Sequence, residues 1–171
     1  MEAKLTQPHL IMAAQASISI MKTLKKHIQI IEKEVMSKIS LREPFQCLLS
    51  VPGIGKILAL TIMLELGDIS RFKEVGNYSS YCRCVRTQRL SNGKSKGKGN
   101  VKNGNKYLSW AYIEAANFAK RYCPYARAFY QRKANQGGTV LAIKALSNKL
   151  SRATYYIMRD NIEYDPKMLF G

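Results

Sequence analysis

The chain has 171 residues, of which 46% are hydrophobic, and a formal net charge of +17. This length fits one domain with a modest core, so the chain is expected to fold rather than to remain disordered. No apolar run is long enough to span a membrane, and nucleic acid is the polyanion that best matches such a charge.

The N-terminal sequence MEAKLTQPHL lacks the charged, apolar and small-residue order of a secretion signal, so we expect a cytoplasmic protein. The four cysteines are then expected to be reduced thiols. Cys82 and Cys84 are spaced too closely for an ordinary zinc site, and His9 and His27 are remote in sequence. We therefore expect no metal site in this chain.

The positive charge is unevenly distributed along the sequence. Residues 75–159 hold seventeen lysines and arginines against one acid, Glu114, whereas residues 1–74 hold ten against seven acids. The second half is therefore expected to carry the anion-binding surface.

Residues 9–39 are expected to form one long helix, because apolar residues recur at steps of three and four without glycine or internal proline. So narrow a stripe favours a coiled-coil seam, which predicts a homo-oligomer formed through residues 10–39. The alternative is a helix that packs on its own domain. The stripe consists of Ile11, Ala14, Ile18, Met21, Leu24, Ile28, Ile31, Val35 and Ile39.

A short apolar turn at residues 45–49 leads to Val51-Pro52-Gly53-Ile54-Gly55-Lys56, and a second helix is expected from Ile57 to Leu66. The two glycines can leave amide N–H groups bare at the start of that helix, where Gly53, Gly55 and Lys56 would hold a phosphate. This pattern resembles the helix-hairpin-helix of DNA-binding proteins. A tight turn between core helices is the alternative.

Further helices are expected over residues 71–82, with Ser70 as N-cap, and over residues 106–121, 125–134 and 139–160. Because no alternating strand pattern persists, the predicted fold is all-α. The predicted organisation is a linking and oligomerisation helix at 1–42 and a helical nucleic-acid-binding domain at 43–171.

Two of these helices have a clear apolar face. In the helix at 106–121, the residues expected to be buried are Leu108, Ala111, Tyr112, Ala115, Ala116 and Ala119. In the helix at 139–160, Val140, Ile143, Leu146, Leu150, Ala153 and Ile157 are expected inward, and Lys144, Lys149, Arg152 and Arg159 outward.

The segment from residue 83 to 106 combines eight basic residues with four glycines and no acid. Like charge at this density cannot be buried, and the glycines suit neither helix nor strand, so we expect an exposed loop that binds a polyanion. Its candidate nucleic-acid-binding residues are Arg83, Arg86, Arg89, Lys94, Lys96, Lys98, Lys102 and Lys106.

In this order the motifs resemble the C-terminal half of the IS110, IS116 and IS902 insertion-sequence transposases, relatives of the pilin-gene invertases. The resemblance covers about residues 10–167. It is carried by the long helix, Val51-Pro52-Gly53-Ile54-Gly55, Ser91-Asn92-Gly93-Lys94, Lys102-Asn103-Gly104-Asn105-Lys106-Tyr107-Leu108, Ala115-Ala116 and Tyr164-Asp165-Pro166.

The resemblance implies a DNA recombinase in which an acid-bearing, nuclease-like domain holds Mg²⁺ and a C-terminal domain supplies a nucleophilic serine. By position that serine is Ser91, with Ser95 as the fallback, although Asn92-Gly93 replaces the Gly-Gly common after the family serine. Nearby cations would stabilise the charge of the phosphoryl transition state. This chain lacks the acid-bearing domain, so we expect it to bind DNA without cutting it when alone.

The family also implies DNA transposition in bacteria or archaea, with the protein at the nucleoid, and a guide RNA as a second partner. Phosphate contacts dominate the binding of both nucleic acids, so the sequence does not separate them. An alternative function is a non-catalytic DNA- or RNA-binding module that uses only the hairpin turn and the basic segment. A third is a basic protein that packages RNA or associates with the ribosome.

Overall fold

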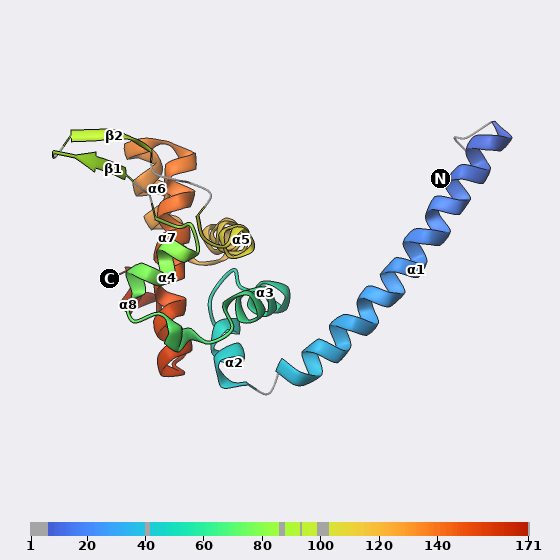
Figure 1. Cartoon of the computed structure of the whole chain (residues 1–171), viewed down its shortest axis with the longest axis horizontal. Helices are drawn as coiled ribbons and strands as arrows, with labels where there is room; N and C mark the ends of the chain where they lie inside the picture. Colours follow the sequence, from blue (N-terminus) through green and yellow to red (C-terminus); the bar gives the residue numbers. More distant parts are fainter. Residues whose placement is uncertain (1–6, 40–41, 86–87, 93, 99–102, 171) are drawn as a thin grey trace. The chain divides into compact units, whose positions relative to one another are not determined.

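The computed structural model describes residues 7–39, 42–85, 88–92, 94–98 and 103–170 (Figure 1). The chain divides into two units, Met1–Ser40 and Leu41–Gly171. The elements are α1 (Pro8–Ile39), α2 (Glu43–Leu49), α3 (Lys56–Leu66), η2 (Ile69–Arg71), α4 (Val75–Tyr81), β1 (Gln88–Ser91), β2 (Lys94–Lys98), α5 (Lys106–Tyr122), α6 (Pro124–Gly137), α7 (Thr139–Asp160) and α8 (Pro166–Phe170).

The first unit contains the single helix α1, which confirms the long helix expected at residues 9–39. Lys38 and Glu34 form an ion pair at 3.0 Å between positions i and i+4. Several stripe residues are exposed to solvent, among them Met21, Leu24, Ile28 and Ile31. Within α1 these stripe residues are therefore exposed to solvent, whereas Ile39 at the end of the helix is buried.

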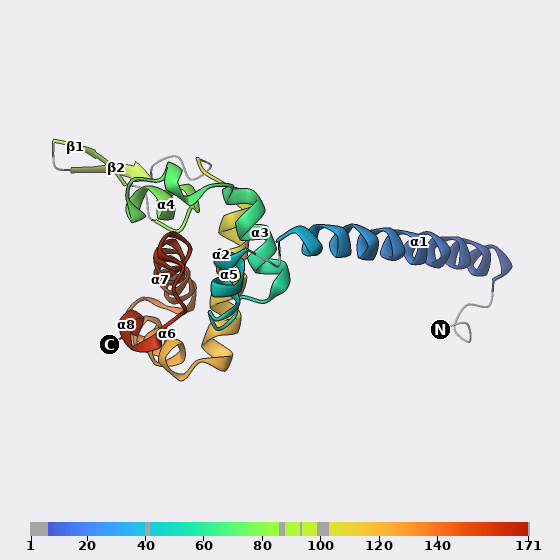
Figure 2. The same ribbon diagram turned by 90° about the horizontal axis from the view of Figure 1, so that it is seen from below.

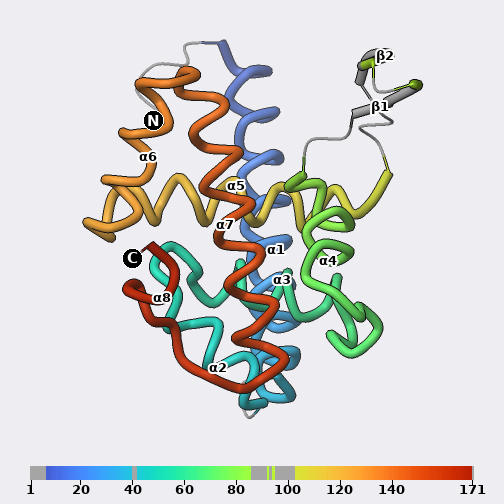
Figure 3. Tube along the Cα trace, turned by 90° about the vertical axis from the view of Figure 1, so that its left-hand side faces the viewer, coloured from blue at the N-terminus to red at the C-terminus, as the bar shows by residue number. Residues whose placement is uncertain are grey.

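The second unit is a bundle of helices in which α7 contacts α2, α4, α5 and α6. Figures 2 and 3 show α7 crossing α5, with α6 alongside α7. The apolar face predicted for α5 is confirmed, since all six of its residues are buried. Small alanines on this face allow the neighbouring backbones to approach closely.

Helix α7 has the predicted bounds, and Leu146, Leu150 and Ile157 are buried as expected. The inward position predicted for Val140 is wrong, because its side chain is 70% exposed. Val140 is the second residue of α7, after Thr139, and lies ahead of the buried part of the helix that begins at Ala142.

Lys149 is half-buried, in contrast to the predicted outward position. Its Nζ lies 5.2 Å from the ring centroid of Phe129 and 5.4 Å from that of Phe170. Burial lowers the pKa of the Lys149 amine, and the neighbouring charges of Arg132 and Lys133 act in the same direction. Cation–π contacts with the two rings therefore hold the aliphatic stem of this lysine against the protein.

Two segment boundaries differ from the prediction. The residues expected to form a turn at 45–49 belong to α2, which starts at Glu43 with Pro44 in its first turn, a position that suits proline. The helix expected from residue 71 is split into η2 and α4, which starts only at Val75. The cap of η2 is Asp68, whose carboxylate accepts a hydrogen bond from Ser70 N at 2.9 Å.

A buried chain of hydroxyl groups connects α4, α5 and α7. The hydroxyl groups of Tyr78 and Tyr112 are 2.5 Å apart, and the Tyr112 hydroxyl lies 2.6 Å from Thr154 Oγ1. Burial raises the pKa of both tyrosines, so both stay neutral and hydrogen-bonded. This network fixes α4, the helix from which the basic segment departs.

The all-α prediction is confirmed, and the one strand pairing in the described residues lies in the basic segment. There β1 and β2 form an antiparallel hairpin, whereas the glycine content had suggested a loop without strands. Two strands need only one short turn and their mutual backbone hydrogen bonds, which the glycines do not prevent. No helix in the described residues is long and apolar enough to cross a membrane.

Candidate nucleic-acid interface

The turn between α2 and α3 is held against α5 by Gly53. This residue has φ +94°, and a Cβ atom placed on it would lie 2.3 Å from Ala115 O and 2.7 Å from Ala119 N. Only glycine fits so close to another helix backbone in this conformation. Gly53 therefore packs the turn on the alanine face of α5.

Gly55 and Lys56 form the open side of the same turn. Gly55 precedes the first residue of α3 with φ −89°, is exposed, and has no neighbouring atom that a Cβ would meet within 4 Å. Lys56 is the first residue of α3 and is also exposed. The first N–H groups of a helix have no partner within it, so this end is suited to an anion. Of the two predicted phosphate-binding glycines, only Gly55 lies on this open side.

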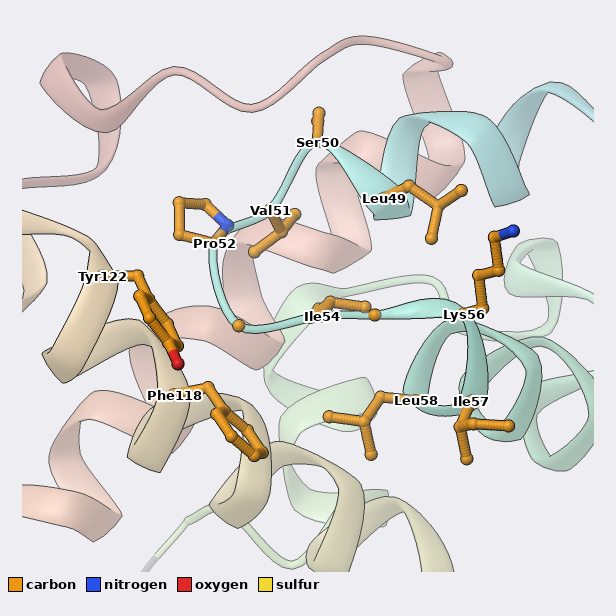
Figure 4. A pocket seen from close by; sticks show the side chains of 12 residues that line it. Leu49, Ser50, Val51, Pro52, Ile54, Lys56, Ile57, Leu58, Phe118 and Tyr122 are labelled. Carbon is orange, nitrogen blue, oxygen red and sulfur yellow. The ribbon is translucent and has the colours of Figure 1, made fainter.

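A shallow pocket of about 600 Å³ surrounds the turn (Figure 4). Two aromatic side chains of α5, Phe118 and Tyr122, lie at one end of it beside Pro52, and Lys56 lies at the other end. These aromatics were not among the binding residues predicted from the sequence. Their spacing of four residues, on the same side of the helix as Ala111 and Ala115, was the available signal.

Arg83 joins the two ends of the basic segment. Its Nε and Nη2 donate hydrogen bonds to Gly104 O at 3.0 and 2.8 Å, and Asn105 N donates to Tyr81 O at 2.7 Å. Gly104 has φ +96°, and a Cβ on it would lie 2.4 Å from Tyr81 O. Arg83 was predicted to contact phosphate, and its guanidinium also holds the start of the basic segment to its end at Gly104.

Asn105 fixes the return of the segment into α5. Its Oδ1 accepts hydrogen bonds from Tyr107 N at 2.8 Å and Leu108 N at 3.0 Å, as an N-cap does. Its Nδ2 donates to Glu65 Oε2 on α3 at 2.7 Å. Hydrogen bonds from Asn105, and from Arg71, lower the pKa of the Tyr81 hydroxyl. A hydrogen bond between Asn105 and Glu65, which was not predicted from the sequence, therefore holds the segment to α3.

The hairpin places Ser91 directly opposite Lys94, and Leu90 opposite Ser95. The exposed Asn92 follows Ser91 with φ +52°, a conformation that asparagine tolerates in tight turns. Ser91 and Lys94 are thus paired at the end of the two strands. The backbone alone is described for Arg89, Ser91, Ser95, Lys96 and Lys98, whereas Lys94 and Lys106 are exposed.

Two predicted binding residues, Arg86 and Lys102, lie outside the described residues. The remaining candidates fall into two groups, the turn of Gly53, Gly55 and Lys56 and the hairpin segment. Figures 1 and 3 show these groups at different places on the second unit. The predicted binding residues that the structure describes therefore fall on two surfaces rather than one.

The cysteines are free thiols. Burial raises the pKa of Cys82 and raises that of Cys84 to about 11, so both thiols stay protonated near neutral pH. Across the described ranges, no three or more His, Cys, Asp or Glu side chains are grouped closely enough to hold a metal ion.

The family described as the transposase IS116/IS110/IS902 family matches residues 45–131, which include both candidate surfaces. This match covers just over half of the 171 residues, and the chain belongs to that family.

Three relatives agree with this assignment. The IS110 uncharacterized 43.6 kDa protein of Streptomyces coelicolor is 26% identical over 125 residues, which are 72% of this chain and 31% of the relative. The transposase for insertion sequence element IS1328 of Yersinia enterocolitica is 28% identical over 148 residues, 78% of this chain and 41% of the relative. The IS116 uncharacterized 44.8 kDa protein of Streptomyces clavuligerus is 21% identical over 144 residues, 84% of this chain and 36% of the relative. The chain thus spans about a third of the length of these proteins.

Proposed function

We propose that this chain is the nucleic-acid-binding part of a transposase and that DNA is its main partner. The observation that carries the proposal is the hairpin, which pairs Ser91 with Lys94 in a segment of eight basic residues without an acid. Cations on a two-stranded ribbon can follow a sugar-phosphate backbone without reading bases. The open start of α3, with Lys56, supplies a second phosphate contact.

In the complete transposase, Ser91 is the proposed nucleophile, with Ser95 as the fallback. Its hydroxyl oxygen would attack the phosphorus of a phosphodiester, lose its proton to a base and release the 3′ or 5′ oxygen of the cleaved strand. The result would be a covalent protein–DNA link. Lys94, paired with Ser91 across the hairpin, would offset the charge that develops on the phosphoryl oxygens.

The chain on its own is proposed to bind DNA without cutting it. The described residues offer no cluster of carboxylates that fits Mg²⁺, so no metal-dependent step is assigned to them. In the family, the acid-bearing domain is the expected site of that ion. The second candidate function is a non-catalytic module that binds DNA or a guide RNA through the same phosphate contacts. The separation of the turn at Lys56 from the hairpin segment favours it.

Salt dependence of binding tests the electrostatic basis of this function. The affinity of the chain for a fluorescently labelled DNA duplex, measured by anisotropy, should fall by about 10³-fold or more between about 50 and 200 mM salt. The reason is that each neutralised phosphate releases counterions. A parallel titration with structured RNA of equal length determines the preferred nucleic acid. An affinity that stays constant with salt would contradict binding through phosphate contacts.

We also propose that α1 joins two or more copies of the chain. Ile28 belongs to the apolar stripe and Ile30 lies off it, yet the two are similarly exposed, at 53% and 56%. A charge at a seam position is buried in an oligomer, whereas a charge off the seam stays in water. Ile28→Asp should therefore convert the oligomer to a monomer in light scattering, and Ile30→Asp should leave the oligomer intact. A monomeric unaltered chain at high concentration would exclude the seam.

A further inference from the structure

The aromatic pair of α5 lies on the surface beside the turn between α2 and α3. Phe118 and Tyr122 have nearly parallel rings, with an interplanar angle of 10° and centroids 6.5 Å apart. Tyr122 is 72% exposed and Phe118 is 40% exposed. Large aromatic rings with this much free area lose contact with water when a flat ligand covers them.

The pocket around these rings has apolar walls and no acid among its lining residues. Pro52 and Ile57 border it together with the two rings, and Leu58 closes it from below. Its volume of about 600 Å³ lies within the range of small-molecule sites, so it can take a group the size of a nucleotide. A flat, partly apolar group is the ligand that such walls favour.

One cation lines the pocket, and a second lies near one of its two rings without lining it. Lys56 lies at the end away from the rings, and the guanidinium carbon of Arg121 is 5.8 Å from the centroid of the Phe118 ring. A ligand that contacts both features therefore needs a flat face for the rings and negative charge for the cations. A nucleotide within a strand has both, as a base and its flanking phosphates.

We propose that this pocket binds an unpaired nucleotide of a nucleic-acid strand, with its base on Tyr122 and Phe118 and its backbone toward Lys56 and Arg121. This inference rests on the proposed nucleic-acid-binding function and specifies the state of the substrate. A base inside a duplex has both faces covered by its neighbours, so only an unpaired or extruded base can stack on side chains. The site thus gives preference for strands with exposed bases, whether DNA or RNA.

Stacking can be measured separately from electrostatic attraction. The probe is a labelled single strand that carries 2-aminopurine, whose fluorescence changes when the base stacks, in one DNA arm and one RNA arm. A fully paired duplex serves as the reference. Tyr122→Ala should weaken single-strand binding by roughly five- to a hundredfold and abolish the 2-aminopurine response, because one stacked base is lost. Duplex affinity should not change.

Two control variants accompany this experiment. Tyr122→Phe keeps the ring and should behave as the unaltered chain, whereas Tyr125→Ala removes a tyrosine that is 46% exposed and does not line the pocket. Tyr125→Ala should leave both readouts unchanged. Because Tyr122 is mostly exposed, its replacement is not expected to unfold the domain.

The outcomes separate this inference from the proposed function. If Tyr122→Ala binds single strands as the unaltered chain does, while duplex binding remains salt-dependent, the stacking site is refuted and the nucleic-acid-binding function stands. If neither single strands nor duplex bind at low salt, both fail. If Tyr122→Ala instead changes only the oligomeric state in light scattering, the pocket is a contact between copies of the chain and the proposal is overturned.

Discussion

Replacing Gly53 with alanine is expected to destabilise the second unit by about 3–5 kcal/mol. The added Cβ would lie 2.3 Å from the carbonyl oxygen of Ala115, at a φ of +94° that non-glycine residues rarely adopt. Because the obstructing atoms belong to the backbone of α5, no side-chain rotation relieves the clash. Urea unfolding followed by circular dichroism measures the loss as a lower midpoint.

Two glycines in the same unit provide matched controls for that variant. Gly55→Ala meets no atom within 4 Å at an ordinary φ, so the cost should stay within about 1 kcal/mol. Gly67→Ala also meets no atom within 4 Å but has φ +71°, so this variant isolates the conformational cost, about 1–3 kcal/mol. Equal stability of the Gly53 and Gly55 variants would show that the turn does not pack on α5.

Replacing Ser91 with alanine in a full-length transposase that contains this chain is expected to reduce strand transfer by about three orders of magnitude or more. Alanine removes the hydroxyl that would form the covalent link and leaves the cations of the hairpin in place. DNA affinity should therefore be unchanged while the covalent protein–DNA product disappears from denaturing gels.

Ser95→Ala is the comparison for this experiment. Ser95 lies in β2 opposite Leu90, so the same atom is removed from the neighbouring strand. Unchanged strand transfer in the Ser91 variant, with loss in the Ser95 variant, would assign the nucleophile to Ser95. Strand transfer retained in both serine variants would show that the chain is a non-catalytic binding module.

Much of the fold could be predicted because helical periodicity dominates this sequence. The bounds of α7 and all six buried residues of α5 follow from the spacing of apolar side chains. Periodicity does not reveal how far a helix extends past the core, and therefore Val140 was placed wrongly. It also does not reveal strand pairing between short polar segments, which depends on backbone hydrogen bonds rather than on apolar pattern.

The candidate site was only partly accessible from the sequence. Gly53 and Gly55 look alike in a Pro-Gly-Ile-Gly turn, but the packing of α5 on one side of the turn gives them different environments. In the sequence, Arg83 resembles the other cations of the basic segment. Only the folded chain brings Gly104 O within hydrogen-bonding distance of its guanidinium. Contacts between residues distant in sequence determine these roles, and no local pattern encodes them.

The cationic hairpin is proposed to hold the sugar-phosphate backbone, and removing its charge tests this role most directly. The measurement is the slope of log affinity against log salt for duplex DNA, with Lys94, Lys96 and Lys98 replaced together by glutamine. A matched triple variant replaces Lys22, Lys25 and Lys26 of α1. We expect a slope shallower by about 2–3 in the hairpin variant and an unchanged slope in the α1 variant. An unchanged slope in the hairpin variant would contradict backbone binding by the hairpin.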